Sequence, residues 1–277
     1  MKIVVLTDTH FVAAGETLYA LCPARRLEAA LAVIARDHPD IAFVLISGDL
    51  AHWGQPAAYR ELRRVLSAAR VPVRLMVGNH DRRAAFREVF PEAAADPAGF
   101  IQFLEVREAF TLIALDTLDE STHAGLLCRP RLDFLSRALA EAPTDRPVLL
   151  AQHHPPFDVG LPHMDRIRLR NGDEEAQLLA GVRKPDYLLM GHIHRPVAGR
   201  WQGIPFHIQR AVAHGVAFDL ETRERVPGSH EQPDYALLSV SGGDITILHR
   251  SFLYEGPEFW LDDEAAQRAT ASTLPRR

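Results

Sequence analysis

The sequence predicts an α/β fold in which two β-sheets pack together, helices cover their outer faces, and the C-terminal part is rich in strands. The first third of the 277-residue chain alternates strand-like runs with helical segments, in the order β-α-β-α-β. The first of these runs, Lys2–Thr7, is continuous and rich in β-branched residues, which is typical of a strand buried on both faces. From residue 196 onward, strand-like segments follow one another without helices between them.

The first third of the chain contains three expected strands and three expected helices. The strands cover Lys2–Thr7, Ile41–Ile46 and Val73–Val77. Pro23 and Pro56 open two helices at the first helical position, which proline favours. Apolar residues recur on one face of each helix, at Leu27, Leu31 and Ile34 in the first and at Leu62, Val65, Leu66 and Ala69 in the second. A third helix is expected over Arg82–Phe90.

The middle of the chain continues with strands and helices around one long polar loop, over Pro155–Gly172. Its expected strands are Phe100–Glu105, Phe110–Leu115, Val148–Ala151 and Asp186–Met190. Helices are expected from Pro130 and over Glu174–Lys184. The expected C-terminal strands are Pro196–Trp201, Pro205–Gln209, Val216–Asp219, Tyr235–Ser241 and Asp244–Leu253, followed by a polar, loosely held tail from Asp262.

Composition excludes several classes of protein. The net charge is -5 and the pI is about 6.3, without a basic stripe, so we expect no polymeric nucleic acid as substrate. No apolar stretch reaches membrane-spanning length, and Met1 leads straight into a strand pattern, so we expect a cytoplasmic protein without a membrane partner. Two cysteines, Cys22 and Cys128, are too few for a disulfide framework.

Polar residues follow the apolar runs at five separate strand ends. They are Asp8 and His10, Asp49, Asn79 to Asp81, His153 and His154, and His192 and His194. A single Asp or His at a strand end is usually a cap or a surface residue, but five strand ends that all carry Asp, Asn or His indicate a common site. Imidazole and carboxylate suit zinc, iron, manganese or cobalt. The candidate ligands exceed the needs of one ion, so we expect two divalent ions about 3.5–4 Å apart.

The order and spacing of these residues resemble the signature of the calcineurin-like metallophosphoesterases. The matching series is Asp8-x-His10, Gly48-Asp49, Gly78-Asn79-His80-Asp81, His153-x-Pro155 and Gly191-His192-x-His194. The resemblance implies that Asp8, His10 and His194 hold one metal, that Asn79, His153 and His192 hold the other, and that Asp49 bridges them. It also implies that His80 and Asn79 contact the substrate, that His80 assists the leaving oxygen, and that Asp81 orients His80.

Within this family, the sequence resembles the class III cyclic-nucleotide phosphodiesterase branch. Gly15–Tyr19, Met164-Asp165, Asn171-Gly172 and Gly256-Pro257 further resemble the bacterial glycerophosphodiesterases of metallophosphoesterase type. This likeness implies hydrolysis of small glycerophosphodiesters, by attack of a hydroxide shared by the two ions. It also implies a homodimer or a higher homo-oligomer. A 3′,5′-cyclic nucleotide phosphodiesterase is the alternative, another small phosphodiester or phosphonate ester is a further substrate class, and a non-catalytic scaffold of the same fold is the least favoured.

The resemblance predicts a four-layer α/β/β/α sandwich. We expect residues 1–200 to form the catalytic core and residues 201–277 to complete the second sheet and contribute oligomer contacts. The loops Phe11–Cys22 and Pro155–Gly172 are expected to wall the substrate pocket. The roles of His154 and His214 stay open. Alternating arginines at Arg166, Arg168 and Arg170 favour a solvated strand face over an anion site.

Overall fold

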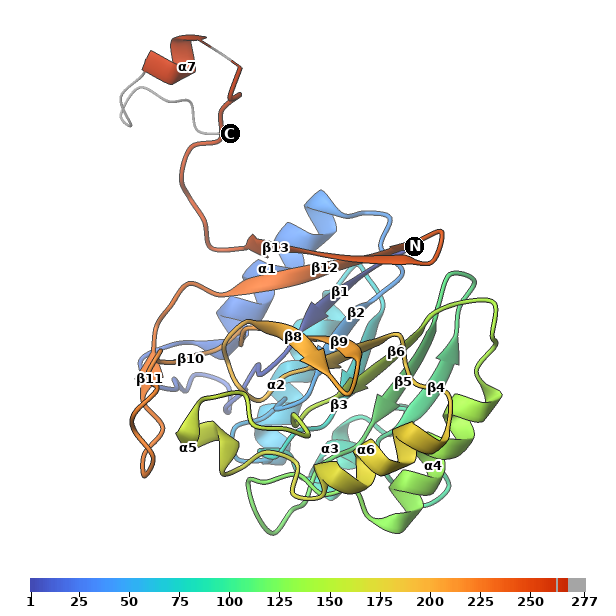
Figure 1. Cartoon of the computed structure of the whole chain (residues 1–277). Coiled ribbons are helices and arrows are strands. Elements are labelled where there is room, and N and C mark those ends of the chain that lie inside the picture. Colours follow the sequence, from blue (N-terminus) through green and yellow to red (C-terminus); the bar gives the residue numbers. More distant parts are fainter. Residues whose placement is uncertain (263, 269–277) are drawn as a thin grey trace.

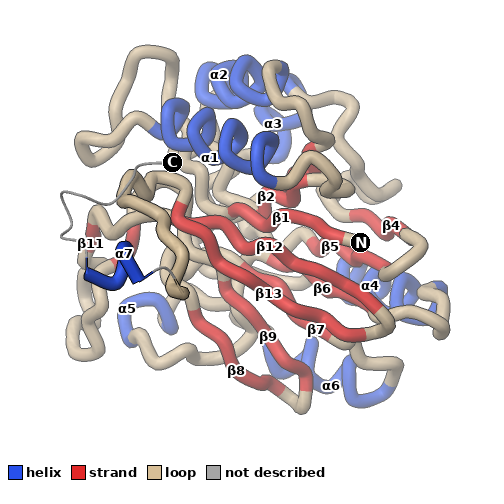
Figure 2. The backbone as a smooth tube through the Cα atoms, turned by 90° about the horizontal axis from the view of Figure 1, so that it is seen from above, coloured by secondary structure: helices blue, strands red, loops and turns tan. Residues whose placement is uncertain are grey.

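Two sheets packed face to face form the centre of the molecule in the computed structural model, which describes residues 1–262 and 264–268 (Figure 1). Helices α1 (Pro23–Asp37), α2 (Pro56–Ser67) and α3 (Arg83–Val89) cover the outer face of one sheet. Helices α4 (Arg129–Glu141) and α6 (Gly172–Gly181) cover the other. Figure 2 shows the two groups of helices on opposite sides of the strands. The predicted four-layer α/β/β/α fold is confirmed.

The first sheet has the strand order β13-β12-β1-β2-β3. Its strands are β1 (Lys2–Leu6), β2 (Val44–Ser47), β3 (Val73–Met76), β12 (Asp234–Ser241) and β13 (Asp244–Ser251). Strands β1, β2 and β3 run parallel, whereas β12 pairs antiparallel with both β1 and β13. The carboxyl ends of β1, β2 and β3 therefore lie at one edge of this sheet.

The second sheet has the order β4-β5-β6-β7-β9-β8. Its strands are β4 (Phe103–Val106), β5 (Thr111–Leu115), β6 (Val148–Gln152), β7 (Tyr187–Met190), β8 (Val197–Trp201) and β9 (Ile204–Ile208). Strands β5, β6, β7 and β9 are parallel, and β4 and β8 are antiparallel edge strands. Strands β6 and β7, which the remaining candidate ligands follow, therefore point the same way.

The C-terminal part of the chain divides between both sheets. Strand β9 joins the second sheet, but β12 and β13 extend the first sheet, with Lys2 of β1 opposite Ser239 of β12. The expectation that residues 201–277 complete the second sheet therefore holds only for β9. The antiparallel partner of β1 was not visible in the sequence because pairing between strands more than 200 residues apart leaves no local pattern. The division of the chain at residue 200 stays a prediction.

Other local expectations are also corrected. The second strand begins at Val44 and not at Ile41, and the long loop contains a short helix, α5 (Pro162–Asp165). Arg166 follows this helix and the stretch to Arg170 is not a strand, so the expected solvated strand face is wrong. The predicted strand Val216–Asp219 is a two-residue β10 (Gly215–Val216) that pairs with β11 (Gly228–Ser229). Beyond α7 (Glu264–Arg268), the expected tail lies outside the described residues.

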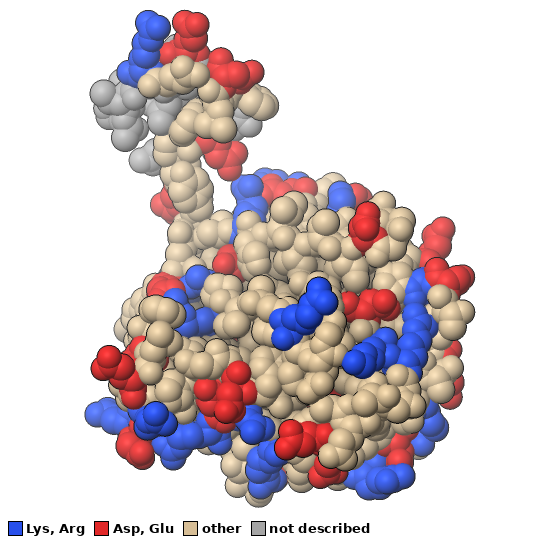
Figure 3. All heavy atoms as spheres, in the orientation of Figure 1, with Lys and Arg blue, Asp and Glu red and all other residues tan. Residues whose placement is uncertain are grey.

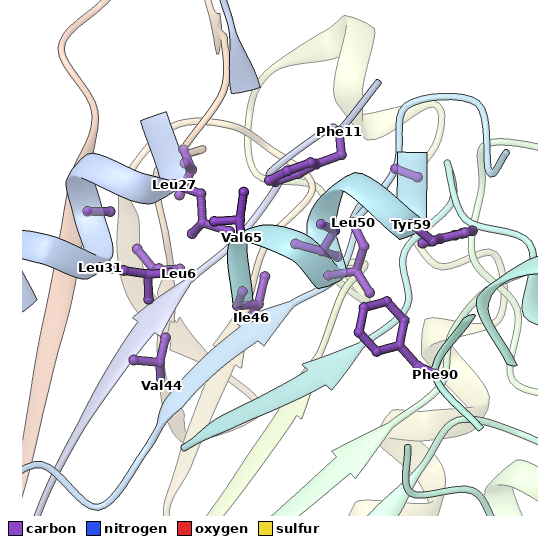
Figure 4. Close-up of a cluster of buried hydrophobic side chains, with 14 of the residues drawn as sticks. Leu6, Phe11, Leu27, Leu31, Val44, Ile46, Leu50, Tyr59, Val65 and Phe90 are labelled. Atoms are coloured by element: carbon purple, nitrogen blue, oxygen red, sulfur yellow. The ribbon is translucent and has the colours of Figure 1, made fainter. Parts of the chain in front are cut away.

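Alternation along the strands explains the layers. In β1, Val4 and Leu6 face the helices, whereas Ile3 and Val5 face the second sheet. Figure 4 shows the helix-facing cluster, in which Leu6 and Ile46 of the sheet pack beneath Leu27 of α1. Because both faces of β1, β2 and β6 are buried, these strands read as continuous apolar runs, and their polar residues appear where the strands leave the core.

Candidate metal centre

The structure brings all the predicted site residues together at one end of the two sheets. Asp8 and His10 follow β1, Asp49 follows β2, Asn79, His80 and Asp81 follow β3, His153 follows β6, and His192 and His194 follow β7. Parallel strands present their carboxyl ends at the same edge, which is where α/β sheets place their sites. Packing two such sheets face to face puts the two sets of turns opposite each other.

One group of donor atoms comes from Asp8, His10, Asp49 and His194, all of them buried and all within 4.8 Å of one another. The Nε2 atom of His194 lies 3.2 Å from Asp8 Oδ1 and 3.0 Å from His10 Nε2. The Nε2 atom of His10 also lies 3.6 Å from Asp49 Oδ2. Two ring nitrogens that face each other at 3.0 Å beside two carboxylates fit the ligand shell of a cation.

A second group lies on the other side of Asp49. The Nε2 atom of His153 is 3.4 Å from Asp49 Oδ1, and the Nδ1 atom of His192 is 2.8 Å from Asn79 Oδ1. Asp49 thus directs one carboxylate oxygen toward each group. A carboxylate in this position suits a bridge between two ions.

Unpaired buried atoms support a fit to metal ions. Among the described residues, Asp8 Oδ1, His153 Nε2 and His192 Nε2 are buried without a hydrogen-bond partner. Leaving a buried polar atom unpaired costs about 1–3 kcal/mol, so such atoms need an explanation. Asp8 Oδ1 and His153 Nε2 point into the donor groups described above, where a divalent cation would satisfy them. The donor set therefore fits divalent metal ions.

The charges in the centre are strongly coupled. Burial alone would raise the pKa of Asp49, but the imidazoles of His153 and His80 outweigh it and hold the pKa well below its ordinary value. Burial disfavours a charge on His153, but Asp49 reverses this and raises its pKa to about 9. The carboxylate therefore attracts positive charge to the space between these two side chains.

The backbone of the turns is strained where the donors sit. Asp8, His10, Asp49, His192 and His194 all have positive φ, between 45° and 70°. This left-handed conformation is unfavourable for residues with a Cβ and collects at functional sites. It turns each side chain inward at the point where the strand has ended. The sequence does not reveal this feature, because none of these residues is a glycine.

Glycine is required beside two of the donors for a different reason. A Cβ on Gly78 would collide with the Asp49 carboxylate and with His153 Nε2, and a Cβ on Gly48 would collide with the His153 ring. These two positions let the turns after β2, β3 and β6 approach one another. Close approach is what places Asn79 and His153 on the same side of Asp49.

The contacts of the Asp81 carboxylate contradict the expectation that Asp81 orients His80. It accepts hydrogen bonds from the backbone N–H groups of Leu50, Ala51 and Gly78, at 3.1, 3.0 and 2.8 Å, and from the Tyr59 hydroxyl at 2.8 Å. It therefore fixes the turns that carry Asp49 and Asn79 and does not orient the His80 imidazole. His80 instead donates from Nδ1 to the main-chain carbonyl of His52, at 2.7 Å.

A cavity of about 670 Å³ opens over the two donor groups. His80 lines it together with Asp49, Asn79, His192 and His194. The two loops expected to wall the pocket do so, through Tyr19 from the first and through Met164 and Ile167 from the second. The β10–β11 ribbon supplies a wall that was not predicted, formed by Gly215, Val216, Val226, Gly228, Ser229 and His230.

Further histidines complete the pocket. His214 lines it, which answers the open question about its place, and burial lowers its pKa to about 2. His52 and His123 also line it and were missed, since neither directly follows a strand. Asn79 Nδ2 lies 3.0 Å from His123 Nδ1, so this loop histidine contacts a predicted ligand. Only the excess of histidine in the composition, 14 in all, pointed to further members.

His154 is held by protein atoms on both ring nitrogens. Its Nδ1 lies 2.7 Å from the Thr117 hydroxyl, and its Nε2 donates to the His123 carbonyl at 3.2 Å. His153, by contrast, directs only Nδ1 to a carbonyl, that of Ser47, and leaves Nε2 free. The contacts thus favour His153 as the ligand and His154 as support for the His123 loop.

Comparison with known proteins identifies the family. The calcineurin-like phosphoesterase family model matches residues 1–196. The chain is 59% identical to a probable cyclic nucleotide phosphodiesterase of Rhodopseudomonas palustris, over 96% of this chain and 98% of that protein. It is 31% identical to the 3′,5′-cyclic adenosine monophosphate phosphodiesterase CpdA of Escherichia coli, over 73% of each chain. It is 28% identical to the glycerophosphodiester phosphodiesterase GpdQ of Enterobacter lignolyticus, over 94% of each chain.

The fold agrees with these relatives. A dimetal phosphatase from Danio rerio aligns with a TM-score of 0.62 at 16% identity, over 91% of this chain and 96% of that one. The chain belongs to the calcineurin-like phosphoesterase family, as its sequence predicted. Within that family it is a metal-dependent phosphodiester hydrolase. In the described part of the chain, none of the helices is both long enough and apolar enough to span a bilayer.

Proposed function

We propose that this protein uses two divalent metal ions to hydrolyse small phosphodiesters, with 3′,5′-cyclic nucleotides as the favoured substrates. The observation that carries the proposal is the composition of the cavity over the donor groups. Apart from Asp49, which faces the metal positions, its lining in the described chain contains no aspartate, glutamate, lysine or arginine. A substrate in this cavity meets imidazoles and apolar side chains.

The residues divide into holding and reacting groups. Asp8, His10 and His194 would hold one ion, Asn79, His153 and His192 the other, and Asp49 both. Two ions of iron, manganese, zinc or cobalt would supply Lewis acidity, an activated water and a template for the phosphate. His80 faces the cavity through Nε2 because its Nδ1–H is donated to the carbonyl of His52. From that position a protonated His80 would deliver a proton to the departing alkoxide oxygen.

The apolar wall supports the choice of substrate. Met164, Ile167, Val216 and Val226 give the cavity an apolar part beside its histidines. Such a wall suits a flat heterocycle such as a nucleobase, because apolar and aromatic surfaces bind it without charge. The relative with 59% identity is also named a probable cyclic nucleotide phosphodiesterase.

Glycerophosphodiesters are the second candidate. The GpdQ relative aligns over 94% of this chain, whereas CpdA aligns over 73%. A glycerophosphodiester that carries an ammonium group, such as glycerophosphoethanolamine, requires a carboxylate or an aromatic cage for that group. Tyr19 is the one aromatic six-membered ring among the described lining residues, and the sole carboxylate is Asp49. The lining of the cavity therefore favours a cyclic nucleotide over the glycerophosphodiester that the sequence resemblance implied.

A substrate panel tests the proposal. Values of kcat/KM are compared for cyclic AMP, cyclic GMP, glycerophosphoethanolamine and a phosphomonoester, with metal-loaded protein. The proposal predicts the highest value for a cyclic nucleotide, with the phosphomonoester the poorest. A preference for glycerophosphoethanolamine of tenfold or more would transfer the function to the second candidate, and absence of hydrolysis of every diester would contradict both.

Two further expectations are part of this proposal. The face shown in Figure 3 mixes acidic and basic side chains, and the net charge of -5 supports a small substrate and not a polymeric nucleic acid. The homo-oligomer implied by the resemblance is supported by β13, an edge strand of the described sheet whose Leu248 is 65% exposed. Light scattering of the full chain measures that state.

A further inference from the structure

His10 differs from the other donor histidines in what holds its second ring nitrogen. His153 and His194 each donate Nδ1–H to a main-chain carbonyl, at 2.9 and 2.7 Å, which leaves Nε2 as the donor atom toward the metal position. His10 also directs Nε2 into the centre. Its Nδ1, however, lies 3.1 Å from Nδ1 of a second imidazole, that of His52.

The contact between two Nδ1 atoms fixes the tautomer of both rings. A neutral imidazole carries one N–H and one lone pair. If Nε2 of His10 binds a cation through its lone pair, its proton must lie on Nδ1 and is donated to His52. His52 then accepts through Nδ1, and its own proton lies on Nε2.

We infer that His52 is a positioning residue for His10 and His80 and that its Nε2–H binds an oxygen of the phosphate ester in the cavity. The inference rests on the proposed function, since it concerns the same substrate. His52 lines the cavity, and with Nδ1 engaged by His10, Nε2 is the ring nitrogen left for a ligand.

The main chain of His52 contributes independently of its ring. Its carbonyl accepts the Nδ1–H of His80 at 2.7 Å. A neutral His80 ring is therefore held in the tautomer that has its lone pair at Nε2. The rings of His52 and His80 also stack, with centroids 4.9 Å apart and planes inclined by 21°. One residue thus connects a metal ligand to the residue that acts on the leaving oxygen.

The local structure makes this position rigid. His52 is only 9% exposed, and its main-chain N–H donates to the Phe11 carbonyl at 2.9 Å. The two residues before it, Leu50 and Ala51, are held by the Asp81 carboxylate. A side chain whose main chain and Nδ1 are both held in this way loses little entropy when Nε2 binds a ligand.

Two substitutions separate the roles of the His52 ring. In His52→Asn, the side-chain oxygen can accept from His10 in place of Nδ1, but no group replaces Nε2–H. We expect both metals to stay bound, while inorganic phosphate, measured as a competitive inhibitor and by calorimetry on zinc-loaded protein, binds about tenfold more weakly. In His52→Ala the acceptor is lost as well, and we expect metal affinity to fall about 10–100-fold. His249→Asn, a histidine on the outer strand β13, is the matched control.

Nitrogen-15 NMR of the zinc-loaded protein reads the tautomer directly. The imidazole signals that disappear in His52→Asn are expected to show a protonated Nε2 and an unprotonated Nδ1. The opposite tautomer would overturn the inference, as would His52→Asn and His52→Ala variants with unchanged phosphate and metal affinity. Neither the NMR signal nor the metal affinity needs turnover. Failure of the wild-type chain to hydrolyse any diester would therefore contradict the proposed function without deciding this point.

Discussion

At the scale of single residues, His80 is the side chain whose environment most directly determines its chemistry. Its Nδ1 is committed to a carbonyl, so one ring nitrogen only is available to the substrate. The His80→Ala variant is expected to keep both metals and to lose about 10²–10⁴-fold in kcat. The loss should be largest for alkyl leaving groups and smallest for p-nitrophenolate, which needs no proton. Metal analysis and a leaving-group series measure both, and loss of metal would show that His80 is a ligand.

Asp81 requires a different expectation from the one that the sequence pattern suggested. Its carboxylate accepts from three backbone N–H groups and one hydroxyl, so Asp81→Asn turns an amide donor toward other donors. We expect a loss of stability of about 1–3 kcal/mol and weaker metal binding, with an unchanged dependence of the remaining rate on the leaving group. Denaturant unfolding and the leaving-group series test this. A changed leaving-group dependence would restore Asp81 as the partner of His80.

At the scale of elements, the turns after the strands depend on close approach. Gly78→Ala would drive a Cβ into Asp49 and His153. The expected result is a loss of about 1–3 kcal/mol of stability together with reduced metal content. Gly181→Ala, at the end of α6 with no atom near its added Cβ, is the matched control and is expected to leave both unchanged. Equal metal content in the two variants would contradict the importance of this packing.

The elements that the sequence predicted well are those with local signals. Proline at Pro23 and Pro56 marked the starts of α1 and α2, and runs rich in apolar residues marked β1, β3 and β6. The ligand turns were found because their polar residues directly follow those runs. The β10–β11 ribbon, the pairing of β12 with β1, and the loop that carries His123 were missed, because long-range pairing and loop position leave no periodic pattern.

At the scale of the whole molecule, one buried acid couples stability to pH. Burial raises the pKa of Glu175 in α6 from its ordinary value of 4.5 to about 8, and its described partner is Gln152, at 3.2 Å. The folded state therefore holds this proton more tightly than the unfolded state does. The stability that the protonated Glu175 contributes is fully present below pH 4.5 and is lost as the pH rises to about 8. Over this range the free energy of unfolding falls by up to about 1.4 kcal/mol per pH unit.

Replacing this acid by its neutral analogue tests the coupling. Glu175→Gln is expected to melt at a higher temperature than the wild type at pH 9 and at a similar temperature at pH 5. The neighbouring Glu174 is exposed, so Glu174→Gln serves as the control and is expected to follow the wild type at both values. A parallel pH dependence for wild type and Glu175→Gln would show that Glu175 is charged in the folded protein.

The central claim is that one carboxylate, Asp49, unites two metal ions into a single hydrolytic centre. Its most direct test is a titration of metal-free protein with manganese or zinc, in which bound metal and hydrolysis of bis(p-nitrophenyl) phosphate are measured on the same samples. The account predicts that activity rises to its maximum at two ions per chain, and that Asp49→Asn binds less metal and hydrolyses near the background rate. Full activity with only one ion bound per chain would contradict this claim. So would full activity of the metal-free protein or of the Asp49→Asn variant.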